Sequence, residues 1–448
     1  MFKLPQKVDE LLLSFSRQFC PSVWERFLAL LMAAVMHRGR RTIWRLILWT
    51  DWALDNAGHF SSFHRVFSER VWSARILAKI FAKALIGTFA PQGILELVGD
   101  DTVSQHRGEK VYGKGCHRDA VRSSHQHVAF RWGHKWVVLA LRVHVPVASR
   151  TWALPVLIAL YRSPEESENC KLKHKTPAEL MQGLLATWMT WFPERKCTFA
   201  GDGGFATHKL SKFAATHKQL TLVSKFVPNA VLHEPPPKRQ KGQNGRPRIK
   251  GDRLPKPQDV VASTTKRRQL NVKWYGGRRR QIETVTGTGH WYRQGHGLVY
   301  VRWVYVHDIS GNHRDEYLYS TDPKMSVKRL IESFVGRWDI EVTFEEMREH
   351  LGLETTRGRC EKTVLRAEPS LFLLYSLIAY WYVQLPKSEQ VIHISWEGKQ
   401  HVTYSDAITS VRRNAWQNYL FPQTDSDPTV EKLTKKKTTQ ILNAITLA

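Results

Sequence analysis

The sequence FVGRWDIEVTFEEMR, residues 334–348, places charged and apolar side chains on adjacent faces of a predicted helix. At roughly 100° per residue, one face within about 60° collects Phe334, Arg337, Glu341 and Arg348. An apolar stripe beside it has the spacing of a buried face and contains Ile340, Phe344, Met347 and Leu351. The pattern predicts a single helix anchored along one edge, with a carboxylate between two guanidinium groups along the next.

The charged face has two interpretations. In the first, Arg337 and Glu341 form an ordinary ion pair one turn apart on a solvated helix. In the second, the order of residues is functional, because aromatic-x2-Arg-x3-Glu-x6-basic resembles the Tyr-x2-Arg-x3-Glu-x6-Lys signature of bacterial insertion-sequence transposases with an RNase H-like DDE domain. Phe334 replaces the Tyr of that signature, and Arg348 replaces the Lys. The resemblance implies that Glu341 is catalytic and that two aspartates lie upstream, each at the end of a strand.

Composition indicates a polyanionic partner. The 448 residues include 67 Lys and Arg against 40 Asp and Glu, a formal net charge of +27. The five cysteines show no CxxC or Cys/His ligand spacing, which indicates reduced thiols in a cytosolic protein and argues against a zinc site. The most apolar run, residues 370–385, is too short for a membrane span and predicts a buried helix.

Residues 1–90 predict a helical N-terminal domain. Apolar residues recur at helical spacing in Val8–Arg17 and Ser22–Met36, in TIWRLILWTDWAL, and in two helices joined near Ser68 or Ser73. The resemblance implies a domain that grips the transposon end. A helical cap packed on the catalytic core is the alternative.

Residues 91–227 predict the first part of a catalytic core. GILELVGDDT has the pattern of a buried strand, and HVAFRWG and HKWVVLALRVHVP predict a hairpin with a turn at Gly133–His134. A further strand, a helix opened by the capping box at Thr176–Glu179, a strand, a helix and a strand follow. The resemblance implies an α/β fold: an RNase H-like mixed sheet with flanking helices, a β-rich insertion before the catalytic helix, and the N-terminal helical domain.

Three acids match the catalytic positions of the DDE group. Asp100 and Asp101 both stand at the end of the first strand, and Asp202 lies in the glycine-rich turn AGDGGFA. An Asp-x-Thr pattern selects Asp100, whereas an Asp-Thr pair selects Asp101, so both stay candidates. Two-metal phosphoryl transfer needs carboxylates from separate segments around two cations, and oxygen ligands suit Mg²⁺ or Mn²⁺. The predicted metal ligands are thus Asp202, Glu341 and one of the adjacent pair.

Several other side chains are candidates for DNA contact. Guanidinium groups match phosphate geometry, so Arg337 and Arg348 are expected to bind phosphates, while Phe334 can only pack or stack. Residues 228–322 predict a basic loop followed by a β-rich insertion. In that loop Arg246 and Arg248 suit a minor groove or an ordinary solvated linker. The tryptophans of the insertion are candidates for base stacking or for core packing: Trp274, Trp291 and Trp303.

Residues 323–385 predict the second part of the core, with its catalytic helix and a closing helix from Pro369 to Gln384, and residues 386–448 a tail with a basic run at 431–440. The resemblance implies a DNA transposase that binds the terminal inverted repeats of its element, cleaves DNA and transfers the strand to target DNA. It also implies a homodimer in the synaptic complex, no membrane partner and a nucleoid-associated place in the bacterial cytoplasm. The alternatives are an RNase H-like nuclease without strand transfer and an inactive DNA-binding derivative.

Overall fold

The computed structural model describes residues 4–48, 59–119, 123, 127–238, 245–420 and 445–446. The end of the helix expected in TIWRLILWTDWAL and the basic run at 431–440 lie outside these residues. Within them, no helix combines the length and the apolar character that crossing a membrane requires. The predicted mixed α/β class, with a large mixed sheet and flanking helices, is confirmed.

The first part of the core is a mixed sheet whose strands lie in the order β4-β3-β1-β5-β6. Antiparallel pairing joins β1 to β3 and β3 to β4, whereas β5 and β6 run parallel to β1. The helix α7 leads into β5, and α8 links β5 to β6. The bounds are β1 Leu95–Gln105, β3 Phe130–His144, β4 Thr151–Tyr161, α7 Pro177–Trp191, β5 Cys197–Gly201, α8 His208–Thr216 and β6 Leu220–Lys225. From α7 to β6 the order of helices and strands is the one expected from the sequence, and the capping box at Thr176 is present.

The predicted turn at Gly133–His134 is wrong, because β3 runs straight through both residues. Gly133 lies opposite Gln105, and a Cβ atom on it would collide with the backbone oxygen of Ser104. The glycine therefore permits close approach of two strands and does not mark a turn. The short strand β2, Gly115–Arg118, pairs with the start of β3.

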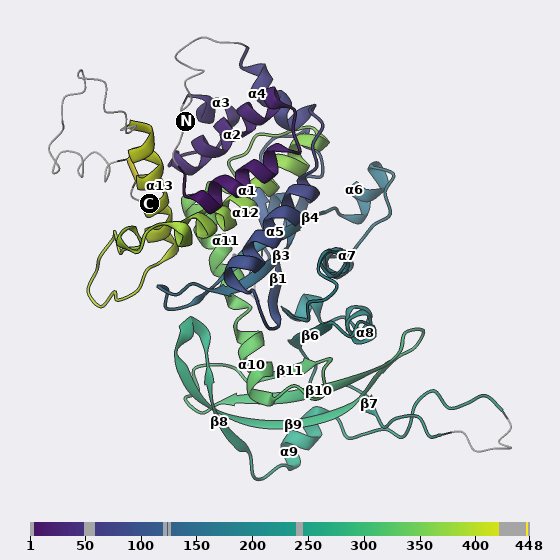
Figure 1. The fold of residues 1–448 in the computed structure, drawn as a ribbon. Helices are drawn as coiled ribbons and strands as arrows, with labels where there is room; N and C mark the ends of the chain where they lie inside the picture. The colour runs from purple at the N-terminus through teal and green to yellow at the C-terminus, as the bar shows by residue number, and fades with distance from the viewer. Residues whose placement is uncertain are drawn as a thin grey trace.

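The predicted β-rich insertion is present and continues the same sheet. β11 pairs antiparallel with β6, and β10, β9 and β7 extend the order to the far edge, with β8 pairing β9 (Figure 1). The bounds are β7 Leu232–His233, α9 Pro257–Ser263, β8 Arg268–Lys273, β9 Arg279–Arg293, β10 Gly297–Asp308 and β11 Glu316–Ser320. Backbone hydrogen bonds thus connect the insertion directly to the strand that follows the second predicted acid.

Helices from both ends of the chain form one layer against the core. The N-terminal helices pack around α12, and α13 packs against α12 and α2 (Figure 1). The bounds are α1 Gln6–Ser16, α2 Pro21–Met36, α3 Ile43–Ile47, α4 Ser61–Ser68, α5 Ala74–Phe89, α12 Glu361–Gln384 and α13 Tyr404–Leu420, with the short α6 Pro164–Asn169 apart from them. Two helices were predicted to join near Ser68 or Ser73, and Ser73 is the N-cap of α5. This packing resembles the helical cap that was the alternative for residues 1–90.

The closing helix α12 begins eight residues earlier than expected, and Pro369 lies inside it. Proline lacks the N–H that would bond to the carbonyl of Leu365, so a helix start at Pro369 was the natural expectation. Apolar side chains surround α12 on nearly all sides, because it packs on β4, α2, α4, α5 and α13. That burial stabilises the helix across the missing hydrogen bond.

The predicted single helix over residues 334–348 is interrupted. Phe334 is the penultimate residue of α10, Val327–Val335. Arg337 immediately precedes the next helix, α11, Trp338–His350. Between them, the backbone bonds tighten to the three-residue spacing, from Arg337 to Phe334 and from Ile340 to Arg337. Gly336 explains the position of the break, since the guanidinium of Arg142 packs where a Cβ would lie.

Candidate active site

The two predicted aspartates end adjacent parallel strands at the same level. Gly99 of β1 pairs with Gly201 of β5, and Asp100 and Asp202 are the next residues of each chain segment. Neighbouring residues in register point to the same face of a sheet, so both carboxyl groups lie on one side. The Oδ1 atom of Asp202 also accepts a hydrogen bond of 2.9 Å from the backbone N–H of Gly204, which fixes the glycine-rich turn.

Arg337 joins the first aspartate to the predicted catalytic glutamate. Its Nη1 atom lies 2.9 Å from Asp100 Oδ2 and 2.6 Å from Glu341 Oε1. Arg337 is 7% exposed, so its pair with Glu341 is not an ordinary pair on a solvated face. Its Nε atom has no hydrogen-bond partner within the described part of the chain. One buried guanidinium thus brings α11 to the end of β1.

Burial and neighbouring charge perturb the first aspartate. Burial raises the pKa of Asp100 to about 7; Arg337 opposes the rise, and the negative charges of Asp202 and Asp101 add to it. Burial lowers the pKa of Arg337, but Asp100 and Glu341 outweigh this and the net pKa is raised. Crowded carboxylates with a raised pKa are typical of a site that gains stability from an added cation.

Asp101 has a different environment from Asp100. Its Oδ1 atom pairs with Lys135 Nζ of β3 at 3.0 Å, and burial raises its pKa against the effect of that lysine. Side chains alternate along a strand, so Asp100 shares its face with Thr102 and not with Asp101. Thr102 Oγ1 accepts a hydrogen bond of 2.5 Å from Arg348 of α11. The face toward α11 is therefore the face of Asp100.

The other two residues of the helical signature occupy contrasting positions. The Arg348 side chain is 37% exposed and lies 3.3 Å from Glu354, so one edge of its guanidinium is open to a ligand. Phe334 is 1% exposed, and its ring lies 5.9 Å from Lys225 Nζ and 5.7 Å from the Arg337 guanidinium. Phe334 thus packs beneath the arginine in this structure.

Among the described contacts, none of the remaining predicted DNA-binding residues touches Asp100, Asp202 or Glu341. Trp274 and Trp303 are 8% and 3% exposed, and Trp291 packs on Phe226, Tyr319 and His208. Arg246 and Arg248 are exposed, and Arg248 pairs with Asp252 at 3.0 Å. Trp274 packs edge-on against Tyr275 at 5.3 Å and against His313 at 5.4 Å, whereas no contact among the described residues leads from the other four to the acids. The role of all five in DNA binding stays a prediction.

An aromatic wall beside the acids was missed from the sequence. Trp338, 44% exposed, packs edge-on against Tyr275 at 5.6 Å, and Tyr275 stacks on His313 at 5.4 Å. Burial raises the pKa of Tyr275 to about 12, with Glu316 and Glu341 adding to the rise, which places its hydroxyl in the field of the acids. The sequence signal for this wall was Trp338, the aromatic residue directly after Arg337 in the helical signature.

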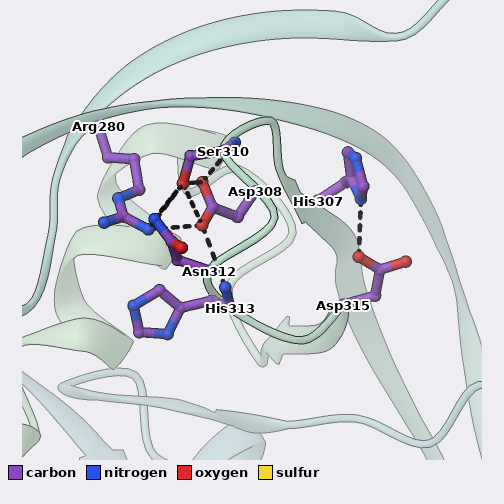
Figure 2. A network of polar contacts seen from close by, with 7 residues as sticks. All are labelled: Arg280, His307, Asp308, Ser310, Asn312, His313 and Asp315. Carbon is purple, nitrogen blue, oxygen red and sulfur yellow. Dashed lines mark hydrogen bonds and ion pairs between the residues drawn. The ribbon is translucent and has the colours of Figure 1, made fainter.

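The loop between β10 and β11 holds His313 in that wall. The buried carboxylate of Asp308 accepts hydrogen bonds from Arg280, from Ser310 and from the backbone N–H of His313 (Figure 2). Asp315 closes the far side of the loop through a contact of 2.8 Å with His307 (Figure 2). These hydrogen bonds fix the conformation of the loop and thus the position of His313.

The carboxylates of this site are the donor type that divalent metal ions with oxygen ligands prefer; within the described residues they do not form one compact ligand group, since Arg337 lies between two of them. Asp100, Asp202 and Glu341 come from β1, the turn after β5 and α11, and they supply carboxylate oxygens without nearby sulfur or imidazole in the contacts described. Such donors suit Mg²⁺ or Mn²⁺. The guanidinium of Arg337 already occupies the position of a cation between two of them.

Comparison with known proteins supports the assignment of a family. No curated protein matches the sequence. Among solved structures, the fold is similar to the cryo-EM structure of a piggyBac transposase synaptic complex with hairpin DNA, at 10% identity and a TM-score of 0.38, over 94% of this chain and 76% of that one. The DDE superfamily endonuclease family matches residues 18–281, which include Asp100 and Asp202 and end before Glu341. Since this match covers more than half of the sequence, the chain belongs to the DDE superfamily endonuclease family.

Proposed function

We propose that this endonuclease is a DNA transposase that binds the terminal inverted repeats of its mobile element, cuts the DNA there and transfers the strand to target DNA. The observation that carries the proposal is the joining of Asp100, at the level of Asp202 in the parallel strands, to Glu341 through Arg337. The ordered acids and the helical signature thus converge on one side of the sheet. The net charge of +27 supports a nucleic-acid partner.

Each residue then has a role at the scissile phosphate. Asp100, Asp202 and Glu341 would hold two Mg²⁺ or Mn²⁺ ions, which activate the attacking oxygen and stabilise the leaving oxygen. Arg337 orients two of these carboxylates and compensates their charge before the ions bind. Arg348, with its exposed edge on the same face as Asp100, contacts a DNA phosphate. Asp101, paired with Lys135, is the weaker candidate for a metal ligand.

The remaining parts of the proposal concern assembly. Two transposon ends must be cut in one complex, so a homodimer is the simplest synaptic unit. The exposed arginines of the basic loop, Arg246 and Arg248, would follow the DNA backbone beyond the cleavage site. Residues 1–90 would hold part of the DNA. The rest of the chain would act on that DNA and consists of four segments: 91–227, 228–322, 323–385 and 386–448.

The deciding experiment incubates the full-length protein with Mg²⁺ and DNA that carries the ends of its element. We expect nicks at the element boundary and products in which the freed 3′-hydroxyl is joined to a target duplex. Nicking without joined products would instead favour an RNase H-like nuclease, and end binding without nicking would favour an inactive derivative. Asp202→Asn serves as the matched control, since it should bind ends without cutting them.

A further inference from the structure

A second polar cluster lies further along β1, apart from the acids. It consists of His106 directly after β1, His134 on β3 and Glu368 on α12, and the atoms that could bind a ligand all lie within 4.8 Å of one another. The three residues are 5%, 1% and 1% exposed, respectively. A carboxylate this deeply buried needs compensating charge or hydrogen bonds. The cluster joins two strands of the sheet to the helical layer.

The hydrogen bonds of His134 leave one contact unexplained. Its Nε2 atom lies 2.9 Å from the backbone oxygen of Tyr112, which can only accept, so Nε2 carries the hydrogen. In a neutral ring, Nδ1 then carries a lone pair, yet Nδ1 faces Glu368 Oε2 at 3.1 Å. Two acceptors this close repel each other unless a proton or a metal ion lies between them. A histidine that binds a metal through one ring nitrogen usually donates the N–H of its other ring nitrogen to an acceptor such as a backbone carbonyl, as His134 does here.

The other atoms of the cluster extend the same pattern. His106 Nε2 lies 3.2 Å from Glu368 Oε2, the same oxygen that faces His134. Among the described residues, Glu368 Oε1 and the hydroxyl of Ser104 are buried without a partner. Ser104 pairs with His134 in the β1–β3 register, so its side chain lies on the same face. Two buried oxygen atoms without a partner among the described residues therefore accompany the two imidazoles.

The spacing of these atoms suits a single ion. Ligands about 2.0–2.1 Å from a tetrahedral metal are about 3.4 Å from one another. The two observed nitrogen–oxygen separations, 3.1 Å and 3.2 Å, are close to that value. Six residues of extended strand separate His106 from Asp100, or about 20 Å, so an ion here could not take part in the acid site.

We propose that His106, His134 and Glu368 bind one divalent metal ion of the class that imidazole prefers, with zinc the first candidate. The ion would neutralise Glu368 and fasten β1, β3 and α12 together. A surface cavity lined by His106, Arg107, Lys114 and Trp132 offers a path for the ion. Cysteine spacing could not show such a site, because its ligands are two histidines and a glutamate separated by up to 262 residues.

The first test measures zinc binding by the full-length protein. The protein is stripped with a chelator, exchanged into buffer with millimolar Mg²⁺, and titrated with Zn²⁺ against a colorimetric zinc indicator. We expect one tight equivalent, and a melting temperature about 3 °C higher when free zinc exceeds the dissociation constant 100-fold. Co²⁺ should give the visible absorption of a nitrogen-ligated site of low coordination number. A wild-type protein without tight zinc binding would overturn the proposal.

Matched variants then locate the ion. His134→Gln and Glu368→Gln should each weaken zinc binding at least about 100-fold. His208→Gln is the control, because His208 is also buried, at 2% exposed, and bonds to a backbone carbonyl, that of Trp291. Asp202→Asn should leave the zinc equivalent in place, which separates this site from the acids. Wild-type zinc affinity in both cluster variants would show that the cluster is held by hydrogen bonds alone. If the cluster variants do not fold, the wild-type titration and the Co²⁺ spectrum still decide.

Discussion

The acid site and the histidine–glutamate cluster lie on the same face of β1, yet they compensate buried negative charge differently. In the acid site, Arg337 supplies a guanidinium to Asp100 and Glu341, and the side chains keep 17% and 32% of their surface exposed. In the cluster, Glu368 is enclosed, and its described polar partners are two imidazoles. Under the proposed function, a carboxylate that must receive ions and substrate is balanced by a side chain that can be displaced. A carboxylate that only joins structural layers can be closed off with its cation.

The largest effect should appear when variants of the acid site are compared with a variant of the histidine–glutamate cluster. Asp202→Asn and Glu341→Gln should reduce DNA cleavage by a factor of about 10³ or more while DNA binding survives, because metal ligation is lost but phosphate contacts remain. Glu368→Gln should leave cleavage by the folded protein nearly unchanged. Asp100→Asn should match Asp202→Asn, and Asp101→Asn should be milder. Gel assays of nicking and of end binding measure all five variants; near-normal nicking by Asp202→Asn would refute the acid site.

Removal of the arginine should affect both rate and stability. Arg337→Ala should slow cleavage about 100-fold, since two ligands lose their common partner. It should also lower the free energy of unfolding by about 2 kcal/mol at pH 8 in chelator, because Asp100 and Glu341 are left without their partner. At pH 6 the loss should be smaller, as Asp100 can become neutral. Urea titrations at both pH values measure this; equal losses at pH 6 and pH 8 would contradict the charge argument.

The raised pKa of Asp100 predicts a pH dependence that the histidine–glutamate cluster does not share. Its pKa is about 7 in the folded chain against an ordinary 3.8, so the contribution to stability is complete below about pH 4 and is lost as pH rises to 7. The change in the metal-free protein should be a few kcal/mol at most, about 4 as an upper bound. Asp100→Asn should flatten it.

Metal binding should follow the opposite trend at the same residue. The ion requires ionised Asp100, so Mn²⁺ affinity should rise up to about tenfold per pH unit below pH 7 and level off above it. Calorimetric titration of the wild-type protein with Mn²⁺ measures this dependence. An affinity that stays constant from pH 5.5 to pH 7 would remove Asp100 from the ligand set.

Arg348 offers a smaller and graded test of the acid site. Arg348→Lys should reduce cleavage less than about tenfold, because it keeps a cation near the DNA and restores the residue of the resembling signature. Arg348→Glu should be clearly worse, since it places a negative charge beside a phosphate. The pair is compared in end-binding assays at several salt concentrations. If the two variants behave alike, the exposed edge of Arg348 does not contact DNA.

The smallest effect is expected far from both sites, in the basic loop. Replacing Arg246 and Arg248 by Ala should reduce the salt dependence of DNA binding by about one to two units of slope. Stability should change by less than about 0.5 kcal/mol, since the pair of Arg248 with Asp252 is exposed. Filter binding across a salt series and a thermal melt measure the two quantities. An unchanged slope would favour the solvated linker.

Local patterns in the sequence were sufficient to predict most elements of the core. Alternation identified the strands, the capping box at Thr176 identified α7, and the glycines around Asp202 identified the turn that carries this acid. The turn at Gly133 and the helix start at Pro369 failed for one physical reason: residues usually found at breaks were used for close packing instead.

Long-range contacts could not be predicted in the same way. Nothing near Arg337 in the sequence indicates that its guanidinium reaches Asp100, 237 residues away, or that Arg142 packs on Gly336. The pairing of β11 with β6 could not be predicted from the sequence either. The residue pattern of a strand shows which of its faces is buried and not which strand lies beside it. The sequence could therefore nominate the acids and arginines, whose roles stay predictions, while their charge balance and the aromatic wall required the fold.

The unbroken sheet from β4 to β7 has a mechanical consequence. Continuous hydrogen bonding from β1 through β6, β11 and β10 makes the insertion and the acids parts of one stiff plate. Tyr275 follows β8, and His313 lies in the loop after β10, so the wall they form keeps a fixed spacing to the acids. Slow amide hydrogen exchange should extend without interruption across β6 and β11. In the proposed complex this stiff surface would adapt little, so any change of shape on binding would fall mainly on the nucleic acid.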